Sequence, residues 1–295
     1  CLMFSVDIIV PFFAKKKELV PLINSLNKLN TKNISVKIII IDDNTKENLD
    51  SIKRLSRFFV KLLHNKKNFG PSYSRNLGVK NSNSQFIWLL DHDVIVENND
   101  FLKIATKLIN KNKYDAISGA KEVLKNTTVN LIPVIFPNSL SLYKIIKSKK
   151  YSIESAYPDG CSIFLKREVF LKKGFFNNKL RAYEEYEWSI RNYKLKMLFR
   201  HDLVVTHREK KTLQKKFSIS YYKNLVYSRS AILKAHKPLS KKILFLLDII
   251  FLPTIFFLLQ VKKSHISSRY LKYGKNKNFF QFFQIIFLLF KSYLK

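Results

Sequence analysis

Apolar residues in the first third of the chain gather in short runs that are separated by more polar stretches. Short, mostly apolar runs bounded by turn-forming residues predict strands that are buried on both faces, as in a parallel sheet. Between the first two runs, apolar positions recur at helical spacing over residues 15–29, which predicts a helix. Strand and helix in alternation predict an α/β fold with a doubly wound, mainly parallel sheet flanked by helices. The first four strands are expected at residues 6–10, 36–41, 59–63 and 86–90.

Proline and glycine mark where several of these elements begin or end. Pro11 should end the first strand, because proline cannot donate a hydrogen bond to a neighbouring strand. Gly70 permits a tight turn, and Pro71 directly after it suits the first turn of a helix. The sequence therefore predicts a helix that starts just beyond the third strand.

Beyond residue 100 the pattern is less regular. Residues 127–155 have weak periodicity and predict a loop-rich or helical insert. Residues 163–165 are apolar, and His207 should stand just beyond a short strand. The other elements expected here are a helix at 102–109, strands at 115–120 and 203–205, and a helical inner face formed by Trp188, Ile190, Leu195 and Met197.

The last part of the chain differs from the rest. We expect residues 1–210 to form the main domain and residues 211–295 to form a basic, aromatic, helical tail with apolar blocks at 243–261 and 279–290. The first block is long enough to cross a bilayer, but Asp248 and Pro253 lie within it, and the second block is short. A pair of interfacial helices on an anionic membrane is the expected arrangement, and packing of both blocks onto the main domain is the alternative.

The chain is strongly basic. It carries 54 Lys and Arg residues against 21 acids, a formal net charge of +33, which predicts a polyanionic partner such as nucleic acid, an anionic membrane or a phosphorylated substrate. With 14% aromatic residues, the chain is not a disordered polycation. Its two cysteines, Cys1 and Cys161, allow no disulfide framework and suit a reducing cytoplasm.

Acidic residues follow two of the predicted strands. Asp42 and Asp43 come after the second strand, and Asp91 and Asp93 come after the fourth. Ligands of open α/β sheets bind beyond the carboxyl ends of the strands. Neighbouring carboxylates repel each other unless a cation joins them, and hard divalent cations prefer carboxylate oxygens. The pattern therefore predicts a metal site at this edge, although an isolated Asp-x-Asp can also be a polar turn.

Taken in order, these motifs resemble those of the inverting family 2 glycosyltransferases, which have the GT-A fold, and in particular enzymes of the bacterial surface-polysaccharide type. The resemblance covers roughly residues 5 to 210. It implies a GT-A catalytic domain with a nucleotide-sugar half at about 1–125 and an acceptor half at about 126–210. The matching pieces are Val10-Pro11, Asp42-Asp43-Asn44-Thr45, Asn68-Phe69-Gly70 to Arg75-Asn76, Asp91-His92-Asp93, Asp159-Gly160, Glu184-Glu185-Tyr186-Glu187 to Arg191, and His207.

The resemblance implies roles for the residues of the nucleotide-sugar half. A carboxylate at Asp43, beside Asp42, can accept a hydrogen bond from a base N–H or a ribose hydroxyl. Magnesium or manganese is the implied cofactor, and it would neutralise charge on the departing nucleoside diphosphate. The residues implied to bind the nucleotide sugar are Pro11, Asp42, Asp43, Arg75, Asn76 and Asp91, and those implied to bind the metal are Asp93, Asp91 and His207.

The acidic pair Glu184-Glu185 matches the family position of the general base. A carboxylate there can take the proton of a sugar hydroxyl as that hydroxyl attacks the anomeric carbon. The resemblance favours Glu185, and Glu184 stays open because the second acid is a Glu here rather than the family's Asp. Asp159, Gly160 and Glu187 are implied to line the acceptor side. Gly174-Phe175-Phe176-Asn177 departs from the usual Gly-Phe-Asp-Glu, so the resemblance does not support an acceptor contact there.

The expected function is transfer of a sugar from a nucleotide-diphosphate donor, with inversion, to a hydroxyl of a glycan or lipid-linked glycan at the cytoplasmic face of the cell membrane. A polyprenyl-phosphate acceptor is the alternative within this class. A sugar-phosphate nucleotidyltransferase is disfavoured, because no Gly-rich phosphate loop follows the first strand. A nucleic-acid-binding protein would explain the charge, but the sequence shows no nucleic-acid module and the acids at the strand ends would have no role.

Overall fold

The computed structural model of the protein describes residues 3–111, 113–124, 127–133, 143–146, 152–155, 158–192 and 194–208. The tail expected at 211–295, with both of its apolar blocks, lies outside the described residues. Within the described ranges, no helix combines the length and the apolar character that crossing a bilayer requires.

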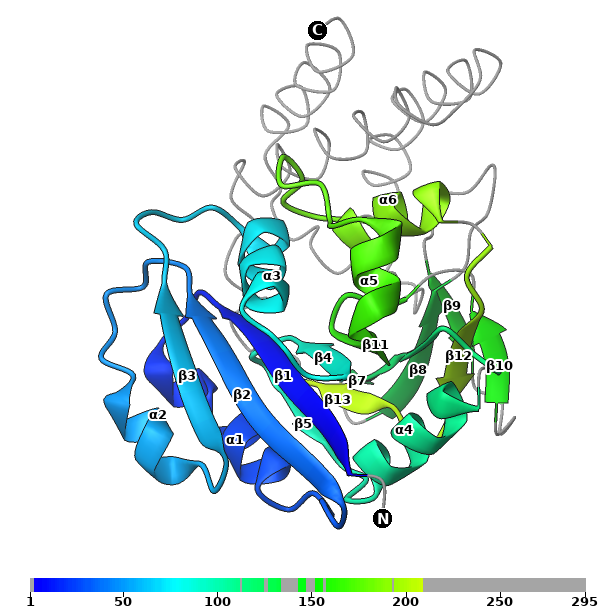
Figure 1. Ribbon diagram of the computed structural model, residues 1–295, viewed down its shortest axis with the longest axis horizontal. Coiled ribbons are helices and arrows are strands. Elements are labelled where there is room, and N and C mark those ends of the chain that lie inside the picture. Colours follow the sequence, from blue (N-terminus) through cyan, green and yellow to red (C-terminus); the bar gives the residue numbers. More distant parts are fainter. Residues whose placement is uncertain are drawn as a thin grey trace, which may run out of the picture.

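Within the part of the chain that the structure describes, an eight-stranded central sheet and a five-stranded second sheet form the framework (Figure 1). The central sheet has the order β10-β12-β6-β11-β4-β1-β2-β3 and the second sheet the order β5-β13-β7-β8-β9. The central strands are β1 (Phe4–Phe12), β2 (Ile34–Asp42), β3 (Phe59–His64), β4 (Phe86–Leu90), β6 (Ala116–Ser118), β10 (Ser152–Ser155), β11 (Ser162–Lys166) and β12 (Met197–Arg200). The second sheet contains β5 (Val94–Val96), β7 (Ala120–Leu124), β8 (Thr127–Pro133), β9 (Tyr143–Ile146) and β13 (Val205–His207).

Helices cover both faces of the central sheet. In Figure 1, α1 (Val20–Leu26), α2 (Asp50–Leu55) and α4 (Phe101–Asn110) lie on one side. The other side carries α3 (Pro71–Lys80), α5 (Arg167–Lys173) and α6 (Glu184–Arg191). A short 3-10 helix, η1 (Lys16–Glu18), precedes α1. The architecture is therefore the expected mixed α/β fold with a mostly parallel central sheet.

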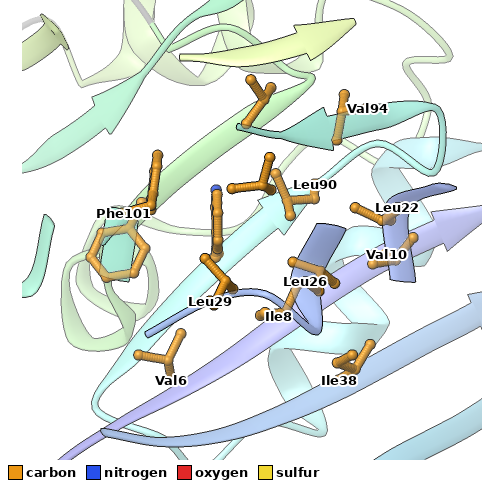
Figure 2. Packing of buried hydrophobic residues seen from close by; sticks show 14 of the residues in the cluster. Val6, Ile8, Val10, Leu22, Leu26, Leu29, Ile38, Leu90, Val94 and Phe101 are labelled. Carbon is orange, nitrogen blue, oxygen red and sulfur yellow. The ribbon is translucent and has the colours of Figure 1, made fainter. Parts of the chain in front are cut away.

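Each face of the sheet has its own hydrophobic cluster. Ile8 and Val10 of β1 pack with residues of α1 and α4 in one cluster, part of which is shown in Figure 2. Ile9 points to the other face, where it packs with Val79 of α3 and the cluster that contains Trp188 of α6. Because successive strand residues point to opposite faces, a strand between two helical layers must be apolar at nearly every position. This explains the continuous apolar runs of the sequence.

The first four strands occur where they are expected, with small differences at their ends. β1 pairs in parallel with β2 and β4, and β2 pairs in parallel with β3. β4 has only one parallel neighbour, because β11 pairs with it in antiparallel orientation. Pro11 does not end β1. It lies opposite Ile41 of β2, whereas the pairing of β1 with β4 already ends at Ile9. The missing N–H is tolerated where the ladder on one side has already ended.

The later part of the chain differs more from the prediction. The described residues within 127–155 form the strands β8, β9 and β10 and no helix, and β7, β8 and β9 pair as an antiparallel meander. Met197 lies in β12 and not on a helical face, and His207 is the last residue of β13 rather than a residue beyond a strand. The helix expected over 15–29 is shorter, because it is divided into η1 and α1.

Candidate active site

Asp91 and Asp93 follow β4, and the second sheet brings His207 to them. β13 pairs with β5 in antiparallel orientation and places His207 opposite Val94. The Nε2 atom of His207 lies 3.2 Å from Oδ1 of Asp93. Asp91, Asp93 and His207 each offer one potential ligand atom, and these three atoms lie within 4.8 Å of one another. The three residues predicted as metal ligands are therefore neighbours in space.

This group fits a hard divalent cation. Two carboxylates so close together repel each other unless a positive charge joins them. Carboxylate oxygens suit magnesium and manganese, and an imidazole nitrogen is accepted by manganese and other transition metals. His92, between the two acids, is not part of the group, and its ring packs edge-on against Phe12. The residues present would thus hold magnesium or manganese.

Arg75 of α3 joins this group to the acidic pair of α6. Its guanidinium binds the carboxylate of Glu184, donates to Asp91 Oδ1 at 2.6 Å and donates to the carbonyl oxygen of Gly160 at 2.9 Å. Burial lowers the pKa of Arg75, but Glu184, Asp91 and Glu185 oppose this effect and hold that pKa above its ordinary value. Arg75 therefore stays charged in the interior and connects three separate segments.

Glu185 is buried at the start of α6. An ideal Cβ atom at Gly160 would lie 3.1 Å from the carboxyl carbon of Glu185, so the Gly160 backbone lies directly against this carboxyl group. Burial raises the pKa of Glu185 well above its ordinary value, as do the charges of Glu184 and Asp159, and Arg75 opposes them. Glu185 thus has the properties of a proton acceptor that is stronger than an exposed carboxylate.

Asp159 lies beside Gly160 and is buried. Its Oδ1 accepts a hydrogen bond from the backbone N–H of Cys161 at 2.9 Å, whereas its buried Oδ2 has no hydrogen-bond partner among the described residues. A buried carboxylate oxygen without a donor is costly. The structure therefore places an unsatisfied hydrogen-bond acceptor next to the residues that surround Glu185.

Asp42 and Asp43 hold the neighbouring loops. Asp43 accepts hydrogen bonds from the Asn65 side chain and from the backbone N–H groups of Phe69 and Gly70 at 2.7–2.8 Å. Asp42 accepts from the backbone of Thr45 and contacts His64. Both acids therefore stabilise the rim of the sheet where the resemblance places the base and ribose.

Asn76 and Glu187, which were predicted to bind the donor and the acceptor, form hydrogen bonds with other residues of the protein. The Asn76 side chain donates to the Phe176 carbonyl and to Asn178, and accepts from the Phe176 N–H. Glu187 forms a two-pronged ion pair with Arg191 one turn later in α6. The structure thus gathers Arg75, Asp91, Gly160, Glu184 and Glu185, whereas Asn76 and Glu187 hold adjacent segments.

Arg181 is a residue of this region that the sequence patterns did not single out. Its guanidinium donates to the side-chain and backbone oxygens of Asn68 at 2.6 and 2.9 Å. It ties the segment before α6 to the loop before α3. No periodicity or known motif marks an arginine in an irregular segment, so nothing in the sequence predicted this contact.

A group of acids that could hold a metal ion, at the strand ends of a mostly parallel sheet and with a buried acid beside it, is the arrangement expected of a GT-A type of protein. A model described as "Glycosyl transferase family 2" matches residues 7–172, more than half of the 295 residues, and the chain belongs to this family. Glu184, Glu185 and His207 lie beyond the matched residues, so their placement rests on the geometry of the structure.

Curated relatives match parts of the chain. An uncharacterized glycosyltransferase of Haemophilus influenzae is 28% identical over 187 residues, which are 63% of this chain and 60% of that protein. An uncharacterized glycosyltransferase of Rickettsia conorii is 26% identical over 62% of this chain and 30% of that protein. The poly(ribitol-phosphate) beta-N-acetylglucosaminyltransferase TarP of Staphylococcus aureus is 31% identical over 31% of this chain and 29% of that protein. The chain thus spans less than two thirds of each of these relatives.

Solved structures share the fold at low identity. TarS 1–349 of S. aureus has a TM-score of 0.57 and 14% identity, over 98% of this chain and 80% of that chain. The mannosyltransferase PcManGT of Pyrobaculum calidifontis, in complex with GDP-Man and Mn²⁺, has a TM-score of 0.58 and 13% identity over 99% and 87%. GalNAc-T7 with UDP, GalNAc and Mn²⁺ has a TM-score of 0.59 and 18% identity over 79% and 48%.

Proposed function

We propose that the protein transfers a sugar from a nucleoside-diphosphate donor, with a divalent metal and with inversion, to a hydroxyl group of a glycan or lipid-linked glycan. The observation that carries the proposal is the connection made by Arg75. One buried guanidinium contacts Asp91 of the metal-binding group and Glu184 beside the candidate base. A donor diphosphate and an acceptor hydroxyl must meet between two such groups for the reaction to occur.

Asp91, Asp93 and His207 would hold the metal ion, which supplies positive charge against the departing diphosphate. The neighbours that were solved with a nucleotide sugar or nucleotide and Mn²⁺ support this part of the proposal. Magnesium and manganese both remain candidates, because the ligand set suits either ion.

Glu185 is the proposed base. Glu184 is the weaker candidate because its carboxylate is bound to Arg75. In the reaction, the acceptor hydroxyl gives its proton to the Glu185 carboxylate while its oxygen forms a bond to the anomeric carbon. The bond between that carbon and the diphosphate oxygen breaks at the same time, and the electron pair leaves with the diphosphate. A single displacement of this kind inverts the anomeric configuration.

The acceptor is proposed to be a glycan of a bacterial surface polymer, on a lipid carrier or as a growing chain. The name of TarP, a transferase of poly(ribitol-phosphate), supports an acceptor from a cell-surface polymer. A polyprenyl phosphate is the other candidate acceptor. The basic, apolar tail supports a location at the cytoplasmic face of the membrane.

A panel of nucleotide sugars tests the proposal by thermal unfolding of the protein. A ligand that binds only the folded state raises the unfolding temperature by mass action. We expect one nucleotide sugar to raise it in the presence of Mg²⁺ or Mn²⁺ and not in excess chelator. If no nucleotide sugar does so with either ion, the proposed donor class is wrong.

A further inference from the structure

Arg181 carries an exposed positive charge that no carboxylate neutralises among the described residues. Its two hydrogen bonds go to the neutral oxygens of Asn68, whereas Arg75, Arg191 and Arg200 are paired with acids. A guanidinium has five N–H donors, so most of them remain for another partner. An arginine fixed in place by neutral oxygens is pre-organised to bind an anion.

The two segments that meet at Arg181 carry cations and no acid. Residues 65–80 and residues 174–183 contain no Asp or Glu. Lys66, Lys67 and Lys179 in these segments are exposed, as is Arg181. Attraction and repulsion by nearby charges decide which ligands approach a surface. An anionic ligand would meet no repelling carboxylate on either segment.

Aromatic rings lie next to these cations. The rings of Phe69 and Tyr73 stack with their centroids 4.4 Å apart, and Lys67 Nζ lies 5.2 Å from the Phe69 centroid. A Cβ atom at Gly70 would lie 3.4 Å from Arg181 Cγ, so Arg181 lies against the turn that follows Phe69. Aromatic rings of this kind present broad apolar faces beside charged groups, which suit a ligand with C–H groups and phosphates.

This surface adjoins the candidate active site. Arg181 precedes Glu184 by three residues and Glu185 by four. The turn at Gly70 leads directly into α3, which provides Arg75, and Figure 1 shows α3 and α6 on the same side of the central sheet. A chain-like ligand bound at Arg181 could therefore extend to the base.

We propose that the surface formed by Lys67, Phe69, Tyr73 and Arg181, here called the Arg181 surface, binds phosphate groups of the acceptor. The acceptor is then a phosphate-bearing glycan or polyol chain rather than a neutral oligosaccharide. This inference rests on the proposed transferase function, because it assigns the acceptor side of that same site.

The test compares two probes, an oligo(glycerol phosphate) and uncharged maltohexaose, by calorimetric titration of the full chain at fixed ionic strength. We expect the phosphate oligomer to bind, and Arg181→Gln to weaken it by about tenfold, the usual effect of losing a charge-assisted contact. Arg54→Gln is the matched control, because Arg54 is an exposed arginine on α2. It should leave the affinity within about twofold of the unmodified protein, since only net charge has changed.

Equal weakening by both variants would overturn the proposal, because the binding would then depend on net charge alone. Unchanged binding in Arg181→Gln, or tighter binding of maltohexaose than of the phosphate oligomer, would also overturn it. If Arg181→Gln instead removes the stabilisation by nucleotide sugar and metal, the residue belongs to the donor side. That stabilisation is measured separately, so failure of the transferase proposal is distinguished from failure of this one.

Discussion

Arg75 of α3 and Glu184 of α6 form an ion pair in which both side chains are only 4% exposed. The two residues are 109 positions apart in the sequence, so the pair joins two distant segments. Breaking a buried pair by removal of one partner leaves an uncompensated charge in the interior. We therefore expect Arg75→Met to lower the free energy of unfolding by about 3–5 kcal/mol, measured by urea denaturation. Glu184→Gln should lower it by less, because Asp91 still pairs with Arg75.

The double variant Arg75→Met/Glu184→Met provides the control, because it leaves no charge of the pair in the interior. Its loss in free energy of unfolding should be smaller than the sum of the losses in the single variants Arg75→Met and Glu184→Met, although Asp91 also loses a partner. Additive losses would mean that the pair is not coupled in solution.

Glu185→Gln tests the proposed base without removing a hydrogen-bond partner of Arg75. The amide keeps the shape of the side chain but cannot accept the proton, so the rate should fall by roughly 10²–10⁴. Stabilisation by the nucleotide sugar should be retained, since the donor is bound elsewhere. If Glu184→Gln shows this pattern and Glu185→Gln does not, the two roles are exchanged.

The pH dependence follows from the raised pKa of Glu185, which has burial as its main cause. The base acts in its ionised form, so kcat should rise with pH through a midpoint above the value of about 4.3 that is usual for Glu. The folded protein binds this proton more tightly than the unfolded chain, so stability should fall as pH rises from the unfolded pKa through the folded one. Glu185→Gln should remove that fall. A rate that decreases with pH over this window would contradict the assignment.

Asp93→Asn and His207→Ala test the metal-binding group. Each change removes one potential ligand of the Asp91–Asp93–His207 group, so donor stabilisation should need a higher metal concentration or disappear. Asp50→Asn is a suitable control because the Asp50 side chain is 59% exposed and lies on α2. Equal metal requirements in all three variants would show that the group does not bind the ion.

The first four strands were predictable because their signal is local. In β4, and in β1 from Ile8 to Val10, consecutive residues are divided between the two hydrophobic clusters, so apolar character is continuous in the sequence itself. The helix that starts at Pro71 was also predictable, because glycine permits a tight turn and proline suits the first turn of a helix. The structure has this turn, with a positive φ of 91° at Gly70. By contrast, β8 and β9 belong to the antiparallel meander β7-β8-β9, and their weak periodicity did not identify them as strands.

The site was predictable only in part, because several of its contacts join segments that are distant in the sequence. Asp91 and Asp93 directly follow a strand, so their position at the sheet edge follows from the sequence. The burial of Arg75 among Glu184, Asp91 and the Gly160 carbonyl depends on tertiary contacts that no spacing encodes. The binding of Asp43 to the backbone of Phe69 and Gly70 was likewise invisible.

The tail beyond residue 210 is proposed to bind anionic membranes. A chain that ends before Lys241 should stay soluble, keep its stabilisation by donor and metal, and no longer pellet with vesicles of anionic lipid. Each Lys or Arg near such a surface contributes about 1 kcal/mol, so removal of the basic connector and both apolar blocks should abolish binding. Misfolding of the shortened chain would instead favour packing of the blocks onto the main domain. Labelling of Ser268→Cys from outside intact cells would show that the first block spans the membrane.

Gly160 and Gly78 offer a paired test of what holds the base in place. At Gly160 an added Cβ atom would lie 3.1 Å from the carboxyl carbon of Glu185, and at Gly78 it would lie 2.3 Å from Cγ2 of Ile9 in the core. Neither glycine is in the positive-φ region, so Ala adds volume without backbone strain. The two changes therefore differ mainly in what the new methyl group displaces.

Gly160→Ala should move the Glu185 carboxylate by a fraction of an ångström. Since rates depend steeply on the position of reacting groups, we expect kcat to fall by about tenfold with little loss of stability. Gly78→Ala should instead overpack the contact between α3 and β1 and lower the free energy of unfolding by about 1–3 kcal/mol. Kinetic and denaturation measurements on both variants separate these effects. A Gly160→Ala protein with full activity would show that the carboxylate has room to move without losing its function, which argues against Glu185 as a base held in one position.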